Sequence, residues 1–329
     1  MTPAINTPHG FDLILPYLRP IEALIQDSGV SEIMVNGGTG RVFIERHGAM
    51  EETGITISEK NLQVAVRNIA RSLSGEISPE KPILDARLPD GSRVAAVFPP
   101  CSVGGTTLTI RKFQTHRFTL QEMLRIGSLT APMADCLRSA VLAKENILIS
   151  GGTGTGKTTL LNALAGFIPP EERVVLIEDT SEIQIHHANL VRFEARRERE
   201  NVPAVTIRDL LKATLRHRPD RIVLGEVRGA EAFDLLQAFN TGHSGSLSTI
   251  HANSAPQALS RFTNCALESD VNLPYKAIRG NIAESLHLLV HIERRQRRRY
   301  VAAIERVSGF DPDGDKYHLE CLHSSGGPA

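Results

Sequence analysis

The chain has 329 residues, with 37 Lys and Arg against 37 Asp and Glu, so its formal net charge is zero. A chain of this length can hold two domains with a large core. Generic binding to DNA or RNA relies on a basic surface, so the balanced charge argues against nucleic acid as a direct partner.

The cysteines and the N-terminal residues indicate a reduced, cytosolic setting. The four cysteines are scattered and form no Cys-x-x-Cys unit. Residues 1–10 lack the apolar stretch of a signal peptide, so we expect no secretory leader. No segment approaches the roughly 20 apolar residues that span a bilayer. We therefore expect a cytoplasmic protein that reaches the inner face of the cell membrane only as a peripheral partner.

The first half of the chain predicts a smaller α+β domain, residues 1–113. Helical spacing of apolar side chains predicts helices over 11–27 and over 58–73, with Ser58 as the N-cap of the second. Alternating apolar residues and turn signals predict a mostly antiparallel set of strands: 32–36, 41–45, 83–88, 93–98 and 106–113. Residues 114–118 are then a linker to a second domain, 119–329.

The second half predicts an α/β domain with a mostly parallel sheet. Short apolar runs alternate with helical stretches, which is typical of strands buried on both faces: 147–150, 174–178, 222–225 and 246–250. Three further strand-like segments form a β-rich tail: 286–292, 300–307 and 316–319.

Residues 151–158, Gly-Gly-Thr-Gly-Thr-Gly-Lys-Thr, fit the phosphate-loop pattern between a strand-like run and a helical stretch. The backbone N–H groups of such a loop and the following helix N-terminus face the phosphates. Lys157 is expected to reach the β- and γ-phosphates, and the Thr158 hydroxyl is expected to bind Mg²⁺. The sequence thus predicts an ATP and Mg²⁺ site formed by Gly151, Gly152, Thr153, Gly154, Thr155, Gly156, Lys157, Thr158 and Thr159.

Acidic residues follow two of the predicted parallel strands, where the sites of α/β proteins gather. Glu178, Asp179 and Glu182 follow one strand, and Glu226 ends another. Either group alone is equally well explained as a solvated strand end, but two of them after a phosphate loop favour an ATPase site. His251 ends a third strand, where it either senses the γ-phosphate or has a purely structural role.

Arginines flank these segments and form one dense run. Arg93 and Arg111 lie on predicted strands of the first half, and Arg192 and Arg196 follow the acidic segment. Arginine is the usual residue for bidentate phosphate contact, although solvated strand edges are the alternative for each. The run Arg294-Arg295-Gln296-Arg297-Arg298-Arg299 predicts a solvated hairpin loop, with a lipid or nucleic acid contact as the alternative.

Four ordered boxes resemble those of the hexameric secretion ATPases of type II and type IV secretion, type IV and Tad pili, and conjugation. The similarity spans roughly Phe11 to Val307 and is greatest to the CpaF-like pilus ATPases and the Trb/Vir-type conjugation ATPases. The boxes are the family's Walker A, Asp box, Walker B and His box: 146–158, 177–182, 218–229 and 241–254.

The resemblance implies a role for each matching residue. Glu182 is similar to the general base, with Glu178 as support and Asp179 in the Mg²⁺ shell. Glu226 is the Walker B acid, acting through a water, and His251 is the γ-phosphate sensor. The resemblance further implies that Arg93 and Arg111 reach the nucleotide from the N-terminal domain. Arg192 and Arg196 lie where the family carries further arginines, although 196–201 is more charged than the CpaF-like form.

The family fold is a RecA-like ATPase domain behind an α+β N-terminal domain. The resemblance implies a homo-hexameric motor that docks on inner-membrane platform proteins and hydrolyses ATP to drive inter-domain movement. A RecA-like DNA translocase or helicase and a nucleotide-gated scaffold without turnover are the alternatives.

Overall fold

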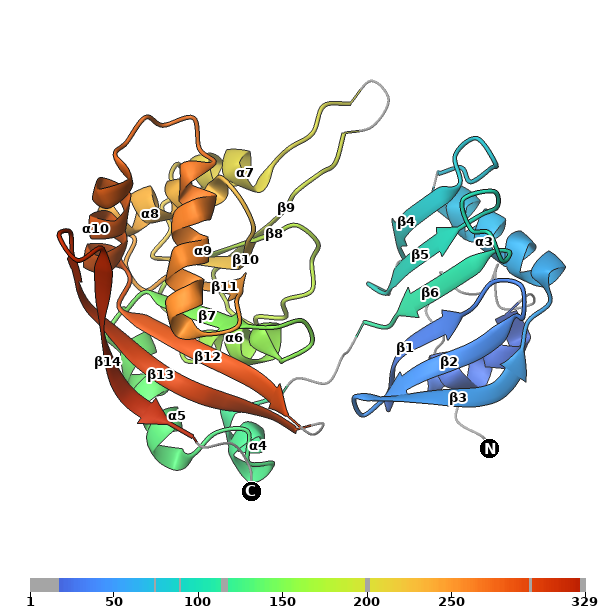
Figure 1. The fold of residues 1–329 in the computed structure, drawn as a ribbon, viewed down its shortest axis with the longest axis horizontal. Helices are drawn as coiled ribbons and strands as arrows, with labels where there is room; N and C mark the ends of the chain where they lie inside the picture. The colour runs from blue at the N-terminus through green and yellow to red at the C-terminus, as the bar shows by residue number, and fades with distance from the viewer. Residues whose placement is uncertain are drawn as a thin grey trace. The chain divides into compact units, whose positions relative to one another are not determined.

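The computed structural model describes residues 18–73, 75–88, 90–113, 118–198, 202–295 and 298–325. The chain divides into two compact units, Met1–His116 and Arg117–Ala329 (Figure 1). Most of the predicted linker, residues 114–117, lies outside the described residues, so the predicted domain boundaries stay a prediction.

The first unit is an antiparallel sheet with helices against it. Its described strands are ordered β3-β2-β1-β6-β5-β4, and every neighbouring pair is antiparallel. They are β1 (Val30–Val35), β2 (Arg41–Arg46), β3 (Ala49–Thr56), β4 (Ile83–Arg87), β5 (Arg93–Val97) and β6 (Thr107–Arg111). The helical elements are η1 (Arg19–Ile21), α2 (Glu22–Gln26) and α3 (Glu59–Ser72). One apolar face of α3 packs on the sheet through Leu62, Val66 and Ile69.

Two expectations for this unit differ from the structure. Residues 11–17 of the first predicted helix lie outside the described residues, and its remainder is a 3₁₀ turn followed by α2 rather than one continuous helix. Strand β3 was not predicted because it lies at the sheet edge, where Glu51, Glu52 and other exposed side chains hide the alternation.

The second unit contains an eight-stranded sheet among the described residues, ordered β14-β13-β12-β7-β11-β10-β8-β9. The neighbours from β12 to β9 are parallel, and β13 and β14 continue antiparallel. The strands are β7 (Ile147–Gly151), β8 (Val174–Glu178), β9 (Leu190–Glu194), β10 (Arg221–Val227), β11 (Leu247–His251), β12 (Leu288–Arg295), β13 (Arg298–Asp311) and β14 (Lys316–Ser324). The predicted α/β class with a mostly parallel sheet is confirmed.

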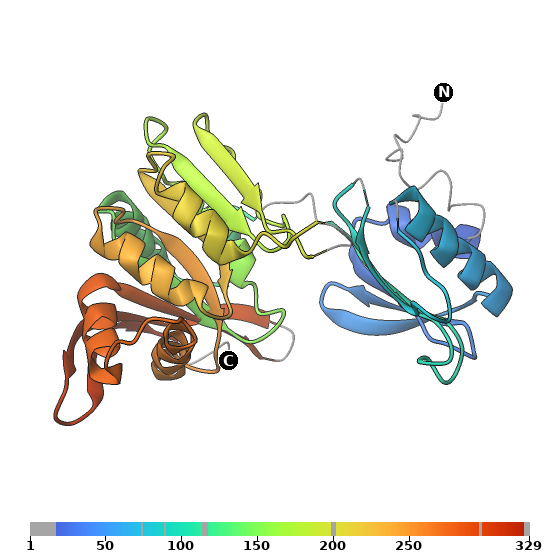
Figure 2. The same cartoon turned by 90° about the horizontal axis from the view of Figure 1, so that it is seen from above.

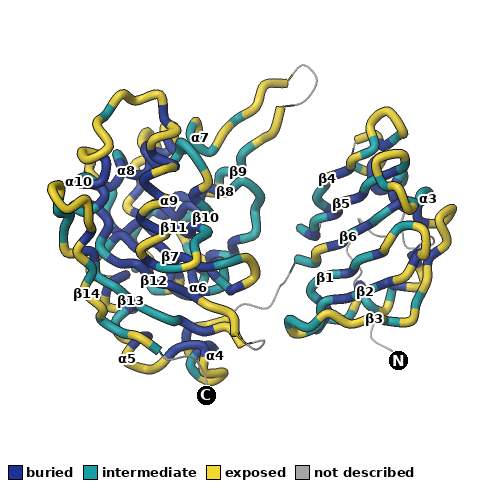
Figure 3. Tube along the Cα trace, in the orientation of Figure 1, coloured by how far each residue is buried: buried dark blue, intermediate teal, exposed yellow. Residues whose placement is uncertain are grey.

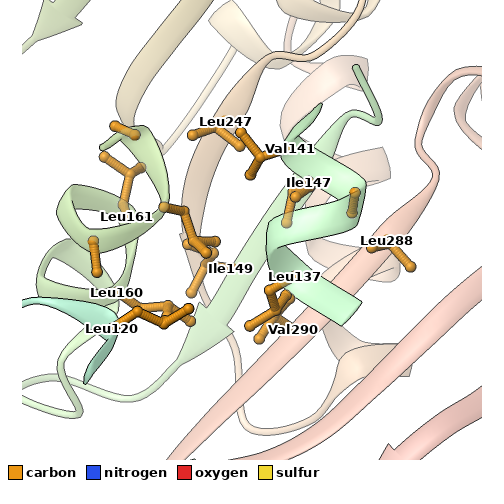
Figure 4. Close-up of a cluster of buried hydrophobic side chains, with 14 of the residues drawn as sticks. Leu120, Leu137, Val141, Ile147, Ile149, Leu160, Leu161, Leu247, Leu288 and Val290 are labelled. Atoms are coloured by element: carbon orange, nitrogen blue, oxygen red, sulfur yellow. The ribbon is translucent and has the colours of Figure 1, made fainter. Parts of the chain in front are cut away.

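Helices cover both faces of this sheet. Successive residues of a strand point to opposite faces, so each central strand contributes side chains to two separate cores. Ile147 and Ile149 of β7 pack with α5 and α6 in one core (Figure 4). Leu148 belongs to the other core. The first core involves α4 (Leu120–Arg125), α5 (Ala131–Leu142) and α6 (Lys157–Ala165). The second involves α7 (Ile207–Thr214), α8 (Glu231–Asn240), α9 (Ala255–Leu267) and α10 (Tyr275–Ser285), of which α8 and α9 are yellow to orange in Figure 2.

The central strands are buried along most of their length, as the dark tube of β7, β10 and β11 shows (Figure 3). Within the described part of the chain, no helix is both long and apolar enough to cross a membrane. Since β7, β8, β10 and β11 are parallel, their carboxyl ends meet at one edge of the sheet. That edge carries the phosphate loop and the predicted acidic residues.

Candidate nucleotide site

The phosphate loop connects the buried strand β7 to helix α6. Gly154 and Gly156 have φ values of 69° and 100°, which side chains with a Cβ rarely adopt. Gly156 is the N-cap of α6, and the Thr155 hydroxyl donates to the Gly152 carbonyl oxygen over 2.9 Å. The loop therefore has a fixed curve that ends at the N-terminus of a helix, where an anion is favoured.

Lys157 lies inside this loop. Its ammonium donates to the carbonyl oxygens of Gly151 (3.1 Å) and Gly152 (3.0 Å) and lies 3.2 Å from Nδ1 of His251. Burial lowers the pKa of Lys157 from 10.5 to about 8, although the Glu226 carboxylate opposes the shift. Thr158 and Thr159 follow it, half-buried in the first turn of α6.

Strands β10 and β11 bring Glu226 and His251 to the same edge. Nε2 of His251 lies 3.0 Å from Oε1 of Glu226. That carboxylate oxygen is buried and makes no hydrogen bond of ordinary geometry within the described residues. Burial and the nearby Lys157 charge lower the pKa of His251, so its imidazole is neutral at physiological pH. Lys157, His251 and Glu226 thus form one continuous series of contacts.

Arg228 joins the two acidic segments. Its guanidinium lies 2.7 Å from Oε2 of Glu226 and 3.1 Å from Oδ2 of Asp179. The Glu182 carboxylate also acts on Arg228 electrostatically, which helps to hold the pKa of this arginine above its ordinary value against its burial. Asp179, Glu182 and Glu226 therefore gather around a single cation, Arg228.

Glu178 fixes the segment that carries Asp179 and Glu182. It is 3% exposed and accepts hydrogen bonds from the backbone N–H groups of Glu182 and Ile183, both over 2.7 Å. Burial raises its pKa, whereas these hydrogen bonds and Arg192 oppose the shift. Arg192 on β9 lies 3.4 Å from Glu178 and donates to the Ser181 hydroxyl and the Ile183 carbonyl, each over 2.7 Å.

The remaining predicted arginines lie elsewhere in the fold. Arg196 follows β9, where its guanidinium donates to the Pro203 carbonyl over 3.1 Å. Arg93 and Arg111 belong to the first unit and face each other across β5 and β6. The roles of these three residues at the nucleotide stay predictions.

Sequence reasoning gave no role to two features of this edge. Arg228 stands two residues after the predicted acid Glu226, and this short spacing was its only signal. His291 on β12 is buried and lies 2.9 Å from the Ser150 hydroxyl, directly before the loop. Because His291 is remote from the loop in sequence, its position next to the loop could not be predicted without knowing that β12 pairs with β7.

The residues present fit ATP with Mg²⁺. The curved loop and the N-terminus of α6 suit phosphate, and the unsatisfied Oε1 of Glu226 suits a water near the metal. Among the described residues, no group of three or more His, Cys, Asp and Glu could hold a metal ion. Magnesium would therefore depend on the nucleotide phosphates together with Thr158, while Asp179 lies against Arg228.

Comparisons with known proteins agree with this geometry. The model of the family described as type II/IV secretion system protein matches residues 17–307. The chain is 38% identical to the conjugal transfer protein TrbB of Rhizobium radiobacter over 292 residues, covering 87% of this chain and 86% of that one. An uncharacterised protein of Methanocaldococcus jannaschii is 42% identical over 245 residues, which are 72% of this chain but only 34% of that protein.

Among solved structures, the Legionella pneumophila ATPase DotB has the same fold. It aligns with a TM-score of 0.63 and 22% identity, covering 94% of this chain and 84% of that one. The predicted RecA-like architecture behind an α+β N-terminal unit is thereby confirmed. The chain belongs to the type II/IV secretion ATPase family.

Proposed function

We propose that this chain hydrolyses ATP to ADP and phosphate as the cytoplasmic motor of a type IV secretion or conjugation machine. The observation that supports this most strongly is the series of contacts from Lys157 through His251 to Glu226. These contacts bring an ammonium, an imidazole and a carboxylate together at one sheet edge, which supports a site for ATP hydrolysis.

Each group has a defined task in this proposal. Lys157 would hold the β- and γ-phosphates, and Thr158 would ligate Mg²⁺, which neutralises phosphate charge when bound. Glu182 would take a proton from the attacking water. The hydrogen bond from its backbone N–H to the Glu178 carboxylate, which we call the Glu178 brace, would position Glu182. Glu226 would order a water through its Oε1, and neutral His251, which lies against Lys157, would act as the γ-phosphate sensor.

The proposal extends to the assembly. The chain would form a homo-hexamer at the inner face of the membrane, docked on platform proteins of the machine. Arg93 and Arg111 would close on the nucleotide, and Arg192 or Arg196 would supply a further arginine. The name of TrbB supports conjugation, while a pilus-assembly role is the alternative within the same family.

Phosphate release by the purified full-length chain tests the proposal. The wild type should turn over ATP, and Glu226→Gln and Glu182→Gln should each slow turnover at least about 100-fold. Lys157→Ala should abolish turnover while the circular dichroism spectrum stays unchanged.

The outcomes separate the alternatives. A wild type that binds ATP without turnover would make the chain a nucleotide-gated scaffold. Strong stimulation of turnover by DNA would favour a DNA translocase. If only one of the two acid substitutions leaves turnover unchanged, the assignment of that residue alone fails.

A further inference from the structure

Arg294 and Arg299, the two ends of the basic run, lie beside the phosphate loop. A Cβ built on Gly154 would lie 3.7 Å from Nη1 of Arg294. A Cβ built on Gly156 would lie 3.7 Å from Cδ of Arg299. Two arginines remote in sequence from the loop thus flank the two glycines that curve it around its ligand.

Strand β12 pairs in parallel with β7, the strand that leads into the loop. Ile292 of β12 is the register partner of Gly151, and its carbonyl oxygen would lie 2.5 Å from a Cβ on that glycine. Below this point the buried His291 lies 2.9 Å from the Ser150 hydroxyl. These contacts lie entirely within the second unit, so the position of Arg294 and Arg299 at the loop is independent of the first unit.

The register of the hairpin sorts its arginines into two faces. Arg294 pairs with Arg299, and Arg295 pairs with Arg298. Partners in register share a face, and successive residues alternate. Arg294 and Arg299 therefore share the face toward the loop, whereas Arg295 and Arg298 share the opposite face with Glu293 and Tyr300.

We propose that Arg294 and Arg299 bind the phosphates of the nucleotide as a second basic wall of the loop. Guanidinium groups form charge-assisted, bidentate bonds with phosphate oxygens. The N–H groups of the loop and the N-terminus of α6 already favour an anion at this position. The inference rests on the proposed function, because it assumes that the loop binds ATP. It assigns this half of the basic run to the nucleotide rather than to lipid or nucleic acid.

Nucleotide titrations by isothermal calorimetry on the full-length chain test the inference. The variant Arg294→Gln/Arg299→Gln should bind ADP and ATP at least about tenfold more weakly, as expected for lost charge-assisted bonds. Inorganic pyrophosphate should lose affinity in parallel, because the contact is with phosphate rather than with the base. The matched variant Arg295→Gln/Arg298→Gln removes the same charge from the other face and should bind like the wild type.

Three results would overturn the inference. One is unchanged ATP affinity in the loop-facing variant, and another is equal weakening in both variants, which would indicate bulk charge alone. The third is a loop-facing variant that loses binding to anionic vesicles or to DNA while its nucleotide affinity is retained. If the wild type itself fails to bind ATP, the proposed function fails and takes this inference with it. The single substitutions Arg294→Gln and Arg299→Gln provide the same comparison if the double variant does not fold.

Discussion

Lys157 holds its proton weakly at a position where the proposed chemistry needs a cation. Its burial lowers the pKa from 10.5 to about 8, and its near neighbours are two carbonyl oxygens of the loop and the imidazole of His251 on β11. The Glu226 carboxylate opposes this shift. Phosphate groups placed against Lys157 add negative charge, which favours the ammonium form and raises the pKa again.

ATP binding should therefore be coupled to proton uptake by Lys157. Around pH 7 the lysine is largely protonated in the free protein, so uptake should be small. With a pKa of about 8, the free lysine is half neutral at pH 8 and largely neutral at pH 9, so proton uptake on binding should grow over this range towards about one proton. By linkage, the affinity for ATP should fall as the pH rises through 8. Isothermal calorimetry in buffers of different ionisation enthalpy measures the uptake directly.

His251 is the other group near the phosphates that could take up the proton, and its pKa is lowered from 6.5. A proton taken up by this imidazole would appear mainly below pH 7, on the opposite side of neutrality. An uptake that does not increase between pH 7 and pH 9 would contradict the assignment to Lys157. An uptake that persists at pH 9 in His251→Ala would support it.

At the level of elements, the buried strands could be predicted from the sequence more easily than the exposed ones. Strands β7, β8, β10 and β11 are buried on both faces, and β7, β8 and β10 each contain a short apolar run that is recognised without knowledge of its neighbours. The edge strand β3 is largely exposed, and β9 is only partly buried, so their polar residues conceal them. Edge strands depend on pairing with a neighbour, which is information that local sequence does not hold.

The residues of the candidate site also fall into those that the sequence predicts and those that depend on strand pairing. The loop and the acids Glu178 and Glu226 directly follow or end recognisable strands, so chain order alone indicates that they share an edge. The role of Arg228 in joining the acids could not be predicted without the pairing of β8 with β10, because its partners Asp179 and Glu226 come from different strands. The place of Arg294 at the loop depends on the pairing of β7 with β12, strands whose residues Ser150 and His291 are 141 positions apart in the chain.

The Glu178 brace gives a prediction that belongs to the segment after β8. Glu178→Gln replaces one acceptor oxygen by a donor and removes the charge that faces two backbone N–H groups and Arg192. The segment from Asp179 to Ile183 should loosen, since a charged acceptor bonds more strongly than a neutral one. ATP turnover should fall about tenfold or more, while affinity for ATP stays within about twofold.

Hydrogen exchange gives a readout beyond turnover. The amides of Glu182 and Ile183 should exchange faster in Glu178→Gln than in the wild type. Glu194→Gln is the matched control, because Glu194 is the register partner of Glu178 at the end of β9 but is exposed. Unchanged exchange at both amides would show that the brace is not what orders this segment.

On the scale of the whole molecule, the chemistry described so far belongs to one unit. The loop, Glu178, Glu182, Glu226, Arg228 and His251 all lie within Arg117–Ala329. In the first unit, Arg93 and Arg111 lie opposite each other on the adjacent strands β5 and β6, and their role at the nucleotide is a prediction. A pair of cations on a separate unit is suited to responding to the charge of a nucleotide held by the other unit.

We expect binding of a non-hydrolysable ATP analogue to change the arrangement of the two units. A triphosphate attracts the Arg93 and Arg111 pair, so its binding should favour arrangements in which this pair approaches the loop. Small-angle X-ray scattering on one oligomeric state, isolated by size exclusion, should record a change in the scattering profile on addition of the analogue. The substitution Arg93→Gln/Arg111→Gln should abolish the change, whereas Lys157→Ala should prevent it by preventing binding. Because calorimetry on the same samples reports whether the analogue is bound, an unchanged profile with the analogue bound would contradict nucleotide-driven movement of the units.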